Sequence, residues 1–285
     1  MSYKTILVHI NDERRLPRLL EAATALAKEQ NVHIIGASVV PPYVIDPAGE
    51  AMFVLPEMME AHRDAYRLQE ERMKAIFHRK MDEEAMQNIK SEWRSLDAGV
   101  NANAADAVIP LARSVDLIIA AQADPKWPSS NLLDFPDRLA TDSGRPVLVI
   151  PNAPRAKFAA KRILVAWNGR REATRAVFDA LPLLKTADDV SVLWIDPQTA
   201  SDESGDVPAA DLCAALARHG VKCGEAASIA PKLSTGETIL NEASKYGWDM
   251  LVMGCYGHSR LREFVLGGAS KHVLTQTSIP VLMAH

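Results

Sequence analysis

The chain has 285 residues, of which 48% are hydrophobic and 24% charged, and its formal net charge at pH 7 is −4. This length suits two domains of about 140 residues each, and the composition is typical of a globular protein. The weak negative charge argues against a general nucleic-acid binder. No apolar run reaches the roughly 18 residues that a membrane span needs.

The beginning of the chain recurs in its second half. The segment KTILVHINDERRLPRLLEAATALA matches KRILVAWNGRREATRAVFDALPLL, which starts at Lys161. Three more pairs follow in the same order: VHIIGASVV with VSVLWID, ARSVDLIIAAQ with SKYGWDMLVMG, and SGRPVLVIP with TSIPVLMAH. Four matches in one order indicate a tandem repeat. We therefore expect domains over residues 1–152 and 160–285, joined by a linker within NAPRAKFAAK.

The first repeat carries an insertion over residues 41–88 that predicts a long helix. Apolar and aromatic residues lie near one helical face of EMMEAHRDAYRLQEERMKAIFHRKMDEEAM. Six of the ten methionines fall between Met52 and Met86. Because methionine adapts to irregular surfaces, two interpretations stay open: a helix that packs on its own sheet, or a binding surface for a protein or lipophilic partner.

The second repeat alternates strands and helices. The predicted strands are 162–167, 190–195, 221–228, 249–254 and 280–284, and the predicted helices are 171–184, 208–219, 235–246 and 260–276. Runs that are apolar on both faces, such as DMLVMG, are typical of parallel strands covered by helices. The predicted fold class is α/β, with two tandem doubly wound parallel-sheet units of about five strands each. Ligands of such sheets bind beyond the carboxyl ends of the strands.

Four glycines follow the fourth strand of the second repeat, in LVMGCYGHSRLREFVLGGASKHVL: Gly254, Gly257, Gly267 and Gly268. Their spacing fits neither the Walker loop nor the Rossmann fingerprint. Glycine nevertheless lets backbone N–H groups approach a phosphate, and the start of the next helix adds further donors. The first repeat has AQADPKWPSSNLLDFPDRLAT here, without a glycine. We therefore expect at most one nucleotide per chain, in the second half.

The spacing Gly254-x2-Gly257-x9-Gly267, with the strands ILVAWNG and IPVLMAH, resembles the ATP-binding signature of the universal stress protein family. The resemblance implies the family's Rossmann-like fold, also called adenine nucleotide α-hydrolase-like, in both halves. It also implies ATP or another adenine nucleotide, with Mg²⁺, as a regulatory ligand. The implied contacts are Ala166, Trp167, Asn168 and Ile195 on the adenine side, and Gly254, Gly257, His258, Gly267, Gly268, Ala269 and Ser270 around the ribose and phosphates. Asn168 stands where the family has Asp, and Gly268 where it has Ser or Thr.

Several side chains have two interpretations. Trp167 and Trp194 end the first two strands of the second repeat, where they either stack on a base or fill the cleft. Cys255 is either a redox-sensitive thiol or a small packing residue. The three cysteines form no C-x-x-C, so neither a disulfide framework nor a zinc site is predicted.

The expected function is that of a cytoplasmic stress-response protein rather than an enzyme, because the sequence shows no nucleophile–base pair, Walker lysine or carboxylate cluster. Two alternatives remain: a slow ATPase or nucleotidyl-transfer enzyme, and an interaction protein acting through its surface and the Met-rich helix. The start MSYKTILVHIND lacks the features of a signal peptide, which favours the cytoplasm. The resemblance also implies a homodimer, and an internal pseudo-dimer formed through the strands PVLVIP and PVLMAH.

Overall fold

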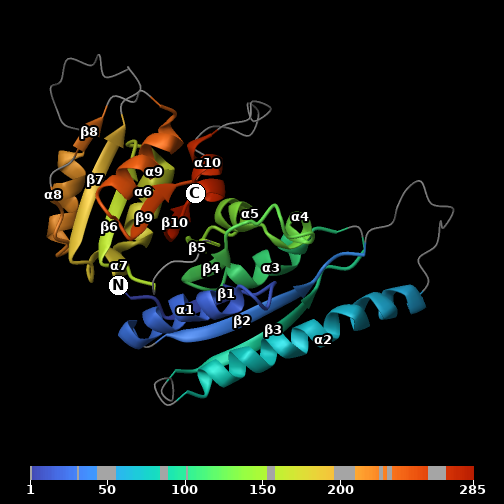
Figure 1. Ribbon diagram of the computed structural model, residues 1–285. Helices are drawn as coiled ribbons and strands as arrows, with labels where there is room; N and C mark the ends of the chain where they lie inside the picture. Colours follow the sequence, from blue (N-terminus) through green and yellow to red (C-terminus); the bar gives the residue numbers. More distant parts are fainter. Residues whose placement is uncertain are drawn as a thin grey trace. The chain divides into compact units, whose positions relative to one another are not determined.

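The computed structural model describes residues 2–30, 32–43, 56–83, 89–100, 102–152, 158–195, 209–224, 227–229, 233–255 and 268–285. The chain forms two compact units (Figure 1). We call Tyr3–Ser143 the N-terminal unit and Gly144–His285 the C-terminal unit. No helix in these ranges is both long enough and apolar enough to cross a membrane.

The N-terminal unit is built on a parallel sheet with the strand order β3-β2-β1-β4. Its elements are β1 (Thr5–His9), α1 (Leu16–Gln30), β2 (His33–Val40), α2 (Pro56–Met81), β3 (Ser91–Asp97), α3 (Ala104–Ala112), β4 (Leu117–Ala121), α4 (Ser130–Leu133) and α5 (Pro136–Asp142). All five residues of β4 are buried, as expected of a strand covered on both faces.

The C-terminal unit repeats this order as β8-β7-β6-β9-β10 and adds β5 beside β10. Its elements are β5 (Val147–Ile150), β6 (Arg162–Trp167), α6 (Arg171–Asp179), α7 (Leu181–Leu184), β7 (Asp189–Ile195), α8 (Ala210–Arg218), β8 (Ala227–Ile229), α9 (Thr235–Lys245), β9 (Met250–Gly254), α10 (Ala269–Gln276) and β10 (Val281–Ala284). The strands β6 to β10 are parallel, and β5 is antiparallel to β10. The predicted fold class of two α/β repeats is confirmed, with five strands from each repeat in the described ranges.

The strand β5 belongs to the first repeat in sequence and to the C-terminal unit in space. Val149 pairs with Val281, and Val147 pairs with Met283. All residues of both strands are buried. The strands PVLVIP and PVLMAH, which the sequence marks for pairing between repeats, therefore do pair.

The structure differs from the predicted elements of the second repeat at one helix, which is divided, and at one strand, which is shorter. The predicted helix 171–184 is divided into α6 and α7 at Ala180, two residues before Pro182, which has no N–H to donate. The predicted strand 221–228 is represented by β8 and by a single bridge between Val190 and Cys223. A turn at Gly220, whose φ is 80°, comes directly before this segment. Of the predicted helix 260–276, residues 260–267 lie outside the described residues, and α10 covers the rest.

The long helix α2 lies along β2 and β3 (Figure 1). Met73, Phe77 and Met81 are its buried residues. The ring of Phe77 packs at 5.5 Å from that of Trp93 on β3. A Cβ on Gly36 of β2 would come within 2.8 Å of the Phe77 ring, so this glycine makes room for it. The C-terminal half of α2 therefore packs on its own sheet, as the first interpretation expects.

Candidate functional site

The predicted adenine-side residues of the C-terminal unit lie at one edge of its sheet. In the strand register, Ala166 of β6 lies beside Met253 of β9, and Trp167 lies beside Trp194 of β7. Ile195 and Gly254 end β7 and β9 at the same edge. Because these strands are parallel, their carboxyl ends form a common border, where α/β sheets bind ligands.

A tight turn follows β6. The Asn168 side-chain oxygen accepts a hydrogen bond of 3.1 Å from the backbone N–H of Arg170. Gly169 between them has a φ of 69°, which glycine adopts without steric cost. The Trp194 ring lies 3.5 Å from where a Cβ on Gly169 would be, so it covers this turn. Asparagine therefore performs the turn-forming task that an aspartate would perform here, and unlike aspartate it carries an amide N–H2 group that can donate.

Gly254 is required by the packing of α6. A Cβ at this position would lie 2.7 Å from the backbone nitrogen of Ala173 and 2.7 Å from Cγ of Glu172. Contacts this short do not occur in folded proteins, so the first turn of α6 fits against β9 only because residue 254 has no side chain. Helix packing therefore explains why residue 254 is a glycine. Its place in a glycine-rich loop does not reveal this role.

Two buried polar atoms near this edge have no hydrogen-bond partner within the described part of the chain: Trp167 Nε1 and Glu172 Oε1. Glu172 is only 3% exposed. One atom is an N–H donor and the other a carboxylate acceptor, and leaving such groups unsatisfied in the interior costs about 1–3 kcal/mol each. Glu172 is not among the site residues predicted from the sequence. The available signal was its position in the sequence: Glu172 lies in the first turn of the helix that directly follows the predicted site strand β6.

The helix α10 begins at the far end of the predicted glycine loop. Gly268 is its N-cap residue, and no side chain caps the helix there. A Cβ on Gly268 would meet no atom of the described residues within 4 Å. Ala269 starts the helix, and Ser270 in its first turn is buried. The predicted loop residues Gly257, His258 and Gly267 lie outside the described residues.

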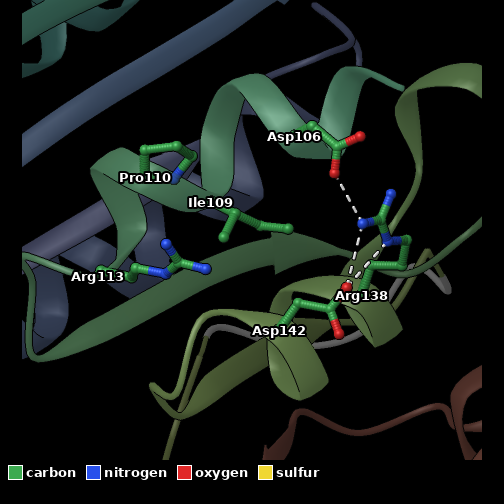
Figure 2. A pocket seen from close by; sticks show the side chains of 6 residues that line it. All are labelled: Asp106, Ile109, Pro110, Arg113, Arg138 and Asp142. Carbon is green, nitrogen blue, oxygen red and sulfur yellow. Dashed lines mark hydrogen bonds and ion pairs between the residues drawn. The ribbon is translucent and has the colours of Figure 1, made fainter. Parts of the chain in front are cut away.

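A pocket of about 320 Å³ lies between α3 and α5 of the N-terminal unit (Figure 2). It is lined by Asp106, Ile109, Pro110, Arg113, Arg138 and Asp142. The Arg138 guanidinium donates to Asp106 at 2.8 Å and to Asp142 at 3.1 Å. The pocket contains none of the predicted nucleotide contacts, and three of its charged side chains, Arg138, Asp106 and Asp142, are bonded to one another.

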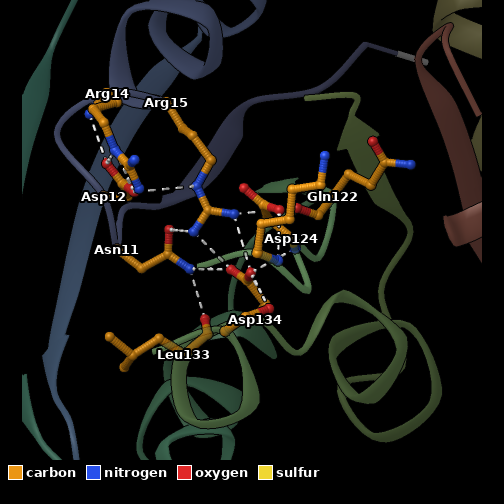
Figure 3. A network of polar contacts seen from close by, with 10 residues as sticks. Asn11, Asp12, Arg14, Arg15, Gln122, Asp124, Leu133 and Asp134 are labelled. Carbon is orange, nitrogen blue, oxygen red and sulfur yellow. Dashed lines mark hydrogen bonds and ion pairs between the residues drawn. The ribbon is translucent and has the colours of Figure 1, made fainter. Parts of the chain in front are cut away.

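The carboxyl edge of the N-terminal sheet is filled by an ion pair between Arg15 and Asp134 (Figure 3). The guanidinium donates to the two carboxylate oxygens at 2.8 and 3.0 Å, and the Asp134 side chain is fully buried. Asp134 also accepts hydrogen bonds from the Ser130 hydroxyl at 2.7 Å and from the Asp124 backbone N–H at 3.0 Å. A buried carboxylate with this many donors is well satisfied.

The ends of β1 and β4 complete this cluster, which we call the Arg15 cluster: Asn11, Arg15, Gln122, Asp124, Trp127, Ser130 and Asp134. The Asn11 amide donates to Asp134 at 2.8 Å, and Arg15 donates to the Asn11 oxygen at 3.0 Å. Arg15 also donates to the Gln122 carbonyl, and its guanidinium lies 4.4 Å from the Trp127 ring centre. In the repeat, Asn11 corresponds to Asn168, and Gln122 to Cys255. The cluster therefore occupies the first repeat's counterpart of the predicted nucleotide site.

Two titratable groups beside the Arg15 cluster have shifted pKa values. Burial lowers the pKa of His9 to about 4, and its ring lies 4.5 Å from that of Phe135. Burial acts to raise the pKa of Asp12, but hydrogen bonds from Arg14 outweigh it and hold that pKa below the usual range. His9 is thus neutral and Asp12 ionised at neutral pH. Among the described residues there is no group of three or more potential metal ligands.

The structure also brings together two side chains that the sequence analysis left apart. The sulfurs of Cys213 and Cys223 are 2.8 Å from each other. Ten residues separate them in the sequence, and this spacing matches no C-x-x-C pattern. Cys255, at the end of β9, is fully buried.

Comparisons with known proteins agree with this arrangement. A model described as the universal stress protein family matches residues 233–285. A segment of 46 residues is 46% identical to universal stress protein Slr1230 of Synechocystis, and the match spans only 16% of this chain and 16% of that relative.

Solved structures resemble the chain over nearly its full length. A universal stress protein from Archaeoglobus fulgidus has a TM-score of 0.69 at 15% identity, covering 98% of this chain and 95% of that one. A protein from Pseudomonas aeruginosa, provisionally named as a universal stress protein, has a TM-score of 0.61 at 16% identity, covering 99% and 93%. At such identities the likeness establishes the fold.

Fold and strand edge together define the class: an α/β protein of two Rossmann-like repeats. The matched residues 233–285 hold α9, β9, α10 and β10, the part that carries the glycine pattern. Residues 233–285 match the universal stress protein family in sequence, and the whole chain has a fold like that of the two solved structures. The recognition from the glycine spacing is thereby confirmed.

Proposed function

We propose that this protein acts as a universal stress protein. It binds one adenine nucleotide per chain, ATP or another adenine nucleotide, in the C-terminal unit. The observation that carries the proposal is the contrast between the two sheet edges. The N-terminal edge is filled by the Arg15 cluster, in which the two terminal nitrogens of Arg15 bond Asp134 and Asn11, and of the buried side-chain polar atoms there only Arg15 Nε and the neighbouring His9 Nε2 lack a hydrogen-bond partner among the described residues. The C-terminal edge keeps Trp167 Nε1 and Glu172 Oε1 buried and unsatisfied by the described residues.

The unsatisfied atoms suit the polar parts of a nucleoside. Trp167 Nε1 is a donor for a ring nitrogen or a ribose oxygen, and Glu172 Oε1 is an acceptor for a ribose hydroxyl or the exocyclic amine. The exposed Asn168 amide adds a second donor beside Trp167, and Ala166 and Ile195 supply apolar contact at the same edge. In this proposal Trp167 is a ligand contact rather than a plug, while Trp194 covers the turn.

The phosphates are assigned to the start of α10. Its first turn presents backbone N–H groups and a partial positive charge to an anion. Gly268, whose Cβ position has no neighbour among the described residues, would let a phosphate approach these groups. Gly254, Gly257, His258 and Gly267 would complete the loop, with Ala269 and Ser270 in the first helical turn. Mg²⁺ bound to the phosphates would offset their repulsion from the Glu172 carboxylate.

The ligand is proposed as a regulator rather than as a substrate, because the described contacts at the strand ends, Ala166, Trp167, Asn168 and Ile195, include no side chain that acts as a nucleophile. A cytoplasmic location and a homodimer belong to the same proposal. The strand pairing β5–β10 within the C-terminal unit gives the two repeats one continuous link, which supports an internal pseudo-dimer.

Calorimetry and thermal denaturation with ATP, ADP, AMP and cyclic AMP test the proposal. Ligand at 100 times its dissociation constant adds about 2.7 kcal/mol of stability, which raises the melting temperature by roughly 5–11 °C. Trp167→Phe keeps the aromatic surface but removes the N–H donor, so the affinity should fall by about threefold to tenfold. Ala121→Val, at the corresponding edge of the N-terminal unit, is the control and should leave the ligand-induced shift intact.

Two results would contradict the proposal. Two sites per chain would show that the Arg15 cluster does not exclude a nucleotide. No binding of any of the four nucleotides at millimolar concentration would favour the interaction protein instead, since the N-terminal half of α2 leaves Met58 and Leu68 exposed.

A further inference from the structure

Cys213 and Cys223 are brought together by the way α8 ends. The chain leaves the helix through a Schellman motif, in which Gly220 has a φ of 80° and donates to the Ala217 carbonyl. The Val221 N–H donates to the Leu216 carbonyl, and the Val221 and Leu216 side chains are both buried. This motif reverses the chain and carries the residues after the helix back along it.

The segment after the motif is held by the sheet. Cys223 forms a parallel bridge with Val190 of β7, and the Gly224 N–H donates to the Val190 carbonyl at 2.7 Å. On the other side, Cys213 is fixed by α8, which buries Leu212 and Leu216. Both thiols are therefore placed by ordered backbone.

The two sulfurs lie 2.8 Å apart, and a disulfide bond measures about 2.05 Å. Small side-chain rotations suffice to close this gap. Both cysteines are partly exposed, whereas Cys255 is fully buried. An oxidant in solution thus reaches the pair and not Cys255.

We propose that Cys213 and Cys223 form a reversible oxidation site, in which a peroxide converts the two thiols into an intramolecular disulfide. In the first step the Cys213 thiolate attacks one oxygen of hydrogen peroxide, the O–O bond breaks, and a sulfenic acid and hydroxide are produced; the hydroxide takes up the proton that the thiol had released and becomes the first water. In the second step the Cys223 sulfur attacks the sulfenic sulfur, loses its proton and expels a second water. The thiols lose two electrons, and the peroxide is reduced by the same two.

The environment of Cys223 supports this order of events. Burial, with a hydrogen bond and repulsion from Cys213, raises the pKa of Cys223 to about 12. Two sulfurs this close do not ionise together, so one thiol attacks the peroxide as the thiolate while the other keeps its proton until it resolves the sulfenic acid. The raised pKa of Cys223 agrees with Cys213 as the attacking sulfur. The product would tie α8 to the segment that leads into β8, the neighbour of Ile195.

Mass spectrometry of the reduced full-length chain after treatment with hydrogen peroxide tests the inference. The intact mass should fall by about 2 Da, the mass of two hydrogen atoms, and dithiothreitol should restore it. Trypsin cuts at Arg218 and Lys222, so the two cysteines fall on separate peptides that stay joined until they are reduced.

Three variants make the test specific. Cys213→Ser should abolish the mass loss, and Cys223→Ser should leave a sulfenic acid on Cys213 that dimedone traps. Cys255→Ser is the matched control and should still lose about 2 Da. The proposal is overturned if the wild-type protein gains oxygen without losing hydrogen, if the joined peptides contain Cys255, or if the disulfide links two chains on a non-reducing gel.

Discussion

Glycine is required at position 254 by the packing of α6, and at position 268 by the proposed approach of a phosphate. Alanine substitutions at the two positions distinguish these requirements. In Gly254→Ala the new Cβ would lie 2.7 Å from two atoms of the α6 first turn, Ala173 N and Glu172 Cγ. Ordinary contact begins near 3.4 Å, so the first turn of α6 must move by roughly 0.7 Å. Overpacking of this kind costs about 1–3 kcal/mol.

Part of this cost is offset, because alanine restricts the unfolded chain and contributes about 0.4–1 kcal/mol. The midpoints of these two ranges leave a net loss of about 1.3 kcal/mol, which should lower the melting temperature by roughly 3–5 °C. Gly268→Ala is the matched control, since its Cβ meets nothing within 4 Å in the described part of the chain and the backbone has an ordinary φ of −67°. Its melting temperature without ligand should stay within about 2 °C of the wild-type value.

Scanning calorimetry without and with ATP distinguishes the two effects. Gly254→Ala should be destabilised in both conditions. Gly268→Ala should lose part of the ligand-induced shift alone, because the methyl group stands where a phosphate is proposed to approach. An unchanged melting temperature for Gly254→Ala would refute the packing explanation. An unchanged ATP shift for Gly268→Ala would refute the phosphate assignment.

Three further predictions concern stability and assembly. Burial keeps His9 neutral in the folded chain, with a pKa of about 4 against 6.5 for the ordinary group. The unfolded chain therefore takes up a proton that the folded chain does not, and stability should fall by up to about 3 kcal/mol as pH drops from roughly 6.5 to 4. His9→Leu should flatten this dependence in urea titrations, and an unaltered slope would assign it to other groups. Residues 1–152 expressed alone should self-associate on size exclusion, because β5 lacks β10 and leaves an apolar edge unpaired; a soluble monomer would count against this. Sedimentation of the whole chain should show a species of twice 31.2 kDa, and a single species at 31.2 kDa would exclude the homodimer.

The strands of the second repeat were predictable because their pattern is local. An apolar run bounded by polar turns predicts β6 over residues 162–167, and the structure has it there. The division of helix 171–184 also has a local cause in Pro182. The helical pattern of apolar residues continues across Pro182, so the pattern alone does not indicate that the helix is divided there.

The candidate site was predictable only in part, because its decisive contacts join distant residues. Asn11 and Asp134 are 123 positions apart, and their cluster explains the closed N-terminal edge better than the missing glycines do. Gly254 looks like a phosphate glycine in sequence, while its neighbour in space is the first turn of α6. Cys213 and Cys223 meet because of a helix-ending motif, which cysteine spacing does not encode.

The pairing of β5 with β10 has a consequence for synthesis on the ribosome. Val147 pairs with Met283, almost at the end of the chain. At about 5–20 residues per second, β5 leaves the ribosome on the order of ten seconds before its partner exists. During this interval the apolar strand VLVI lacks its neighbour on one side. The nascent first repeat thus resembles the isolated fragment 1–152, and we expect it to be the stage of synthesis that depends most on chaperones.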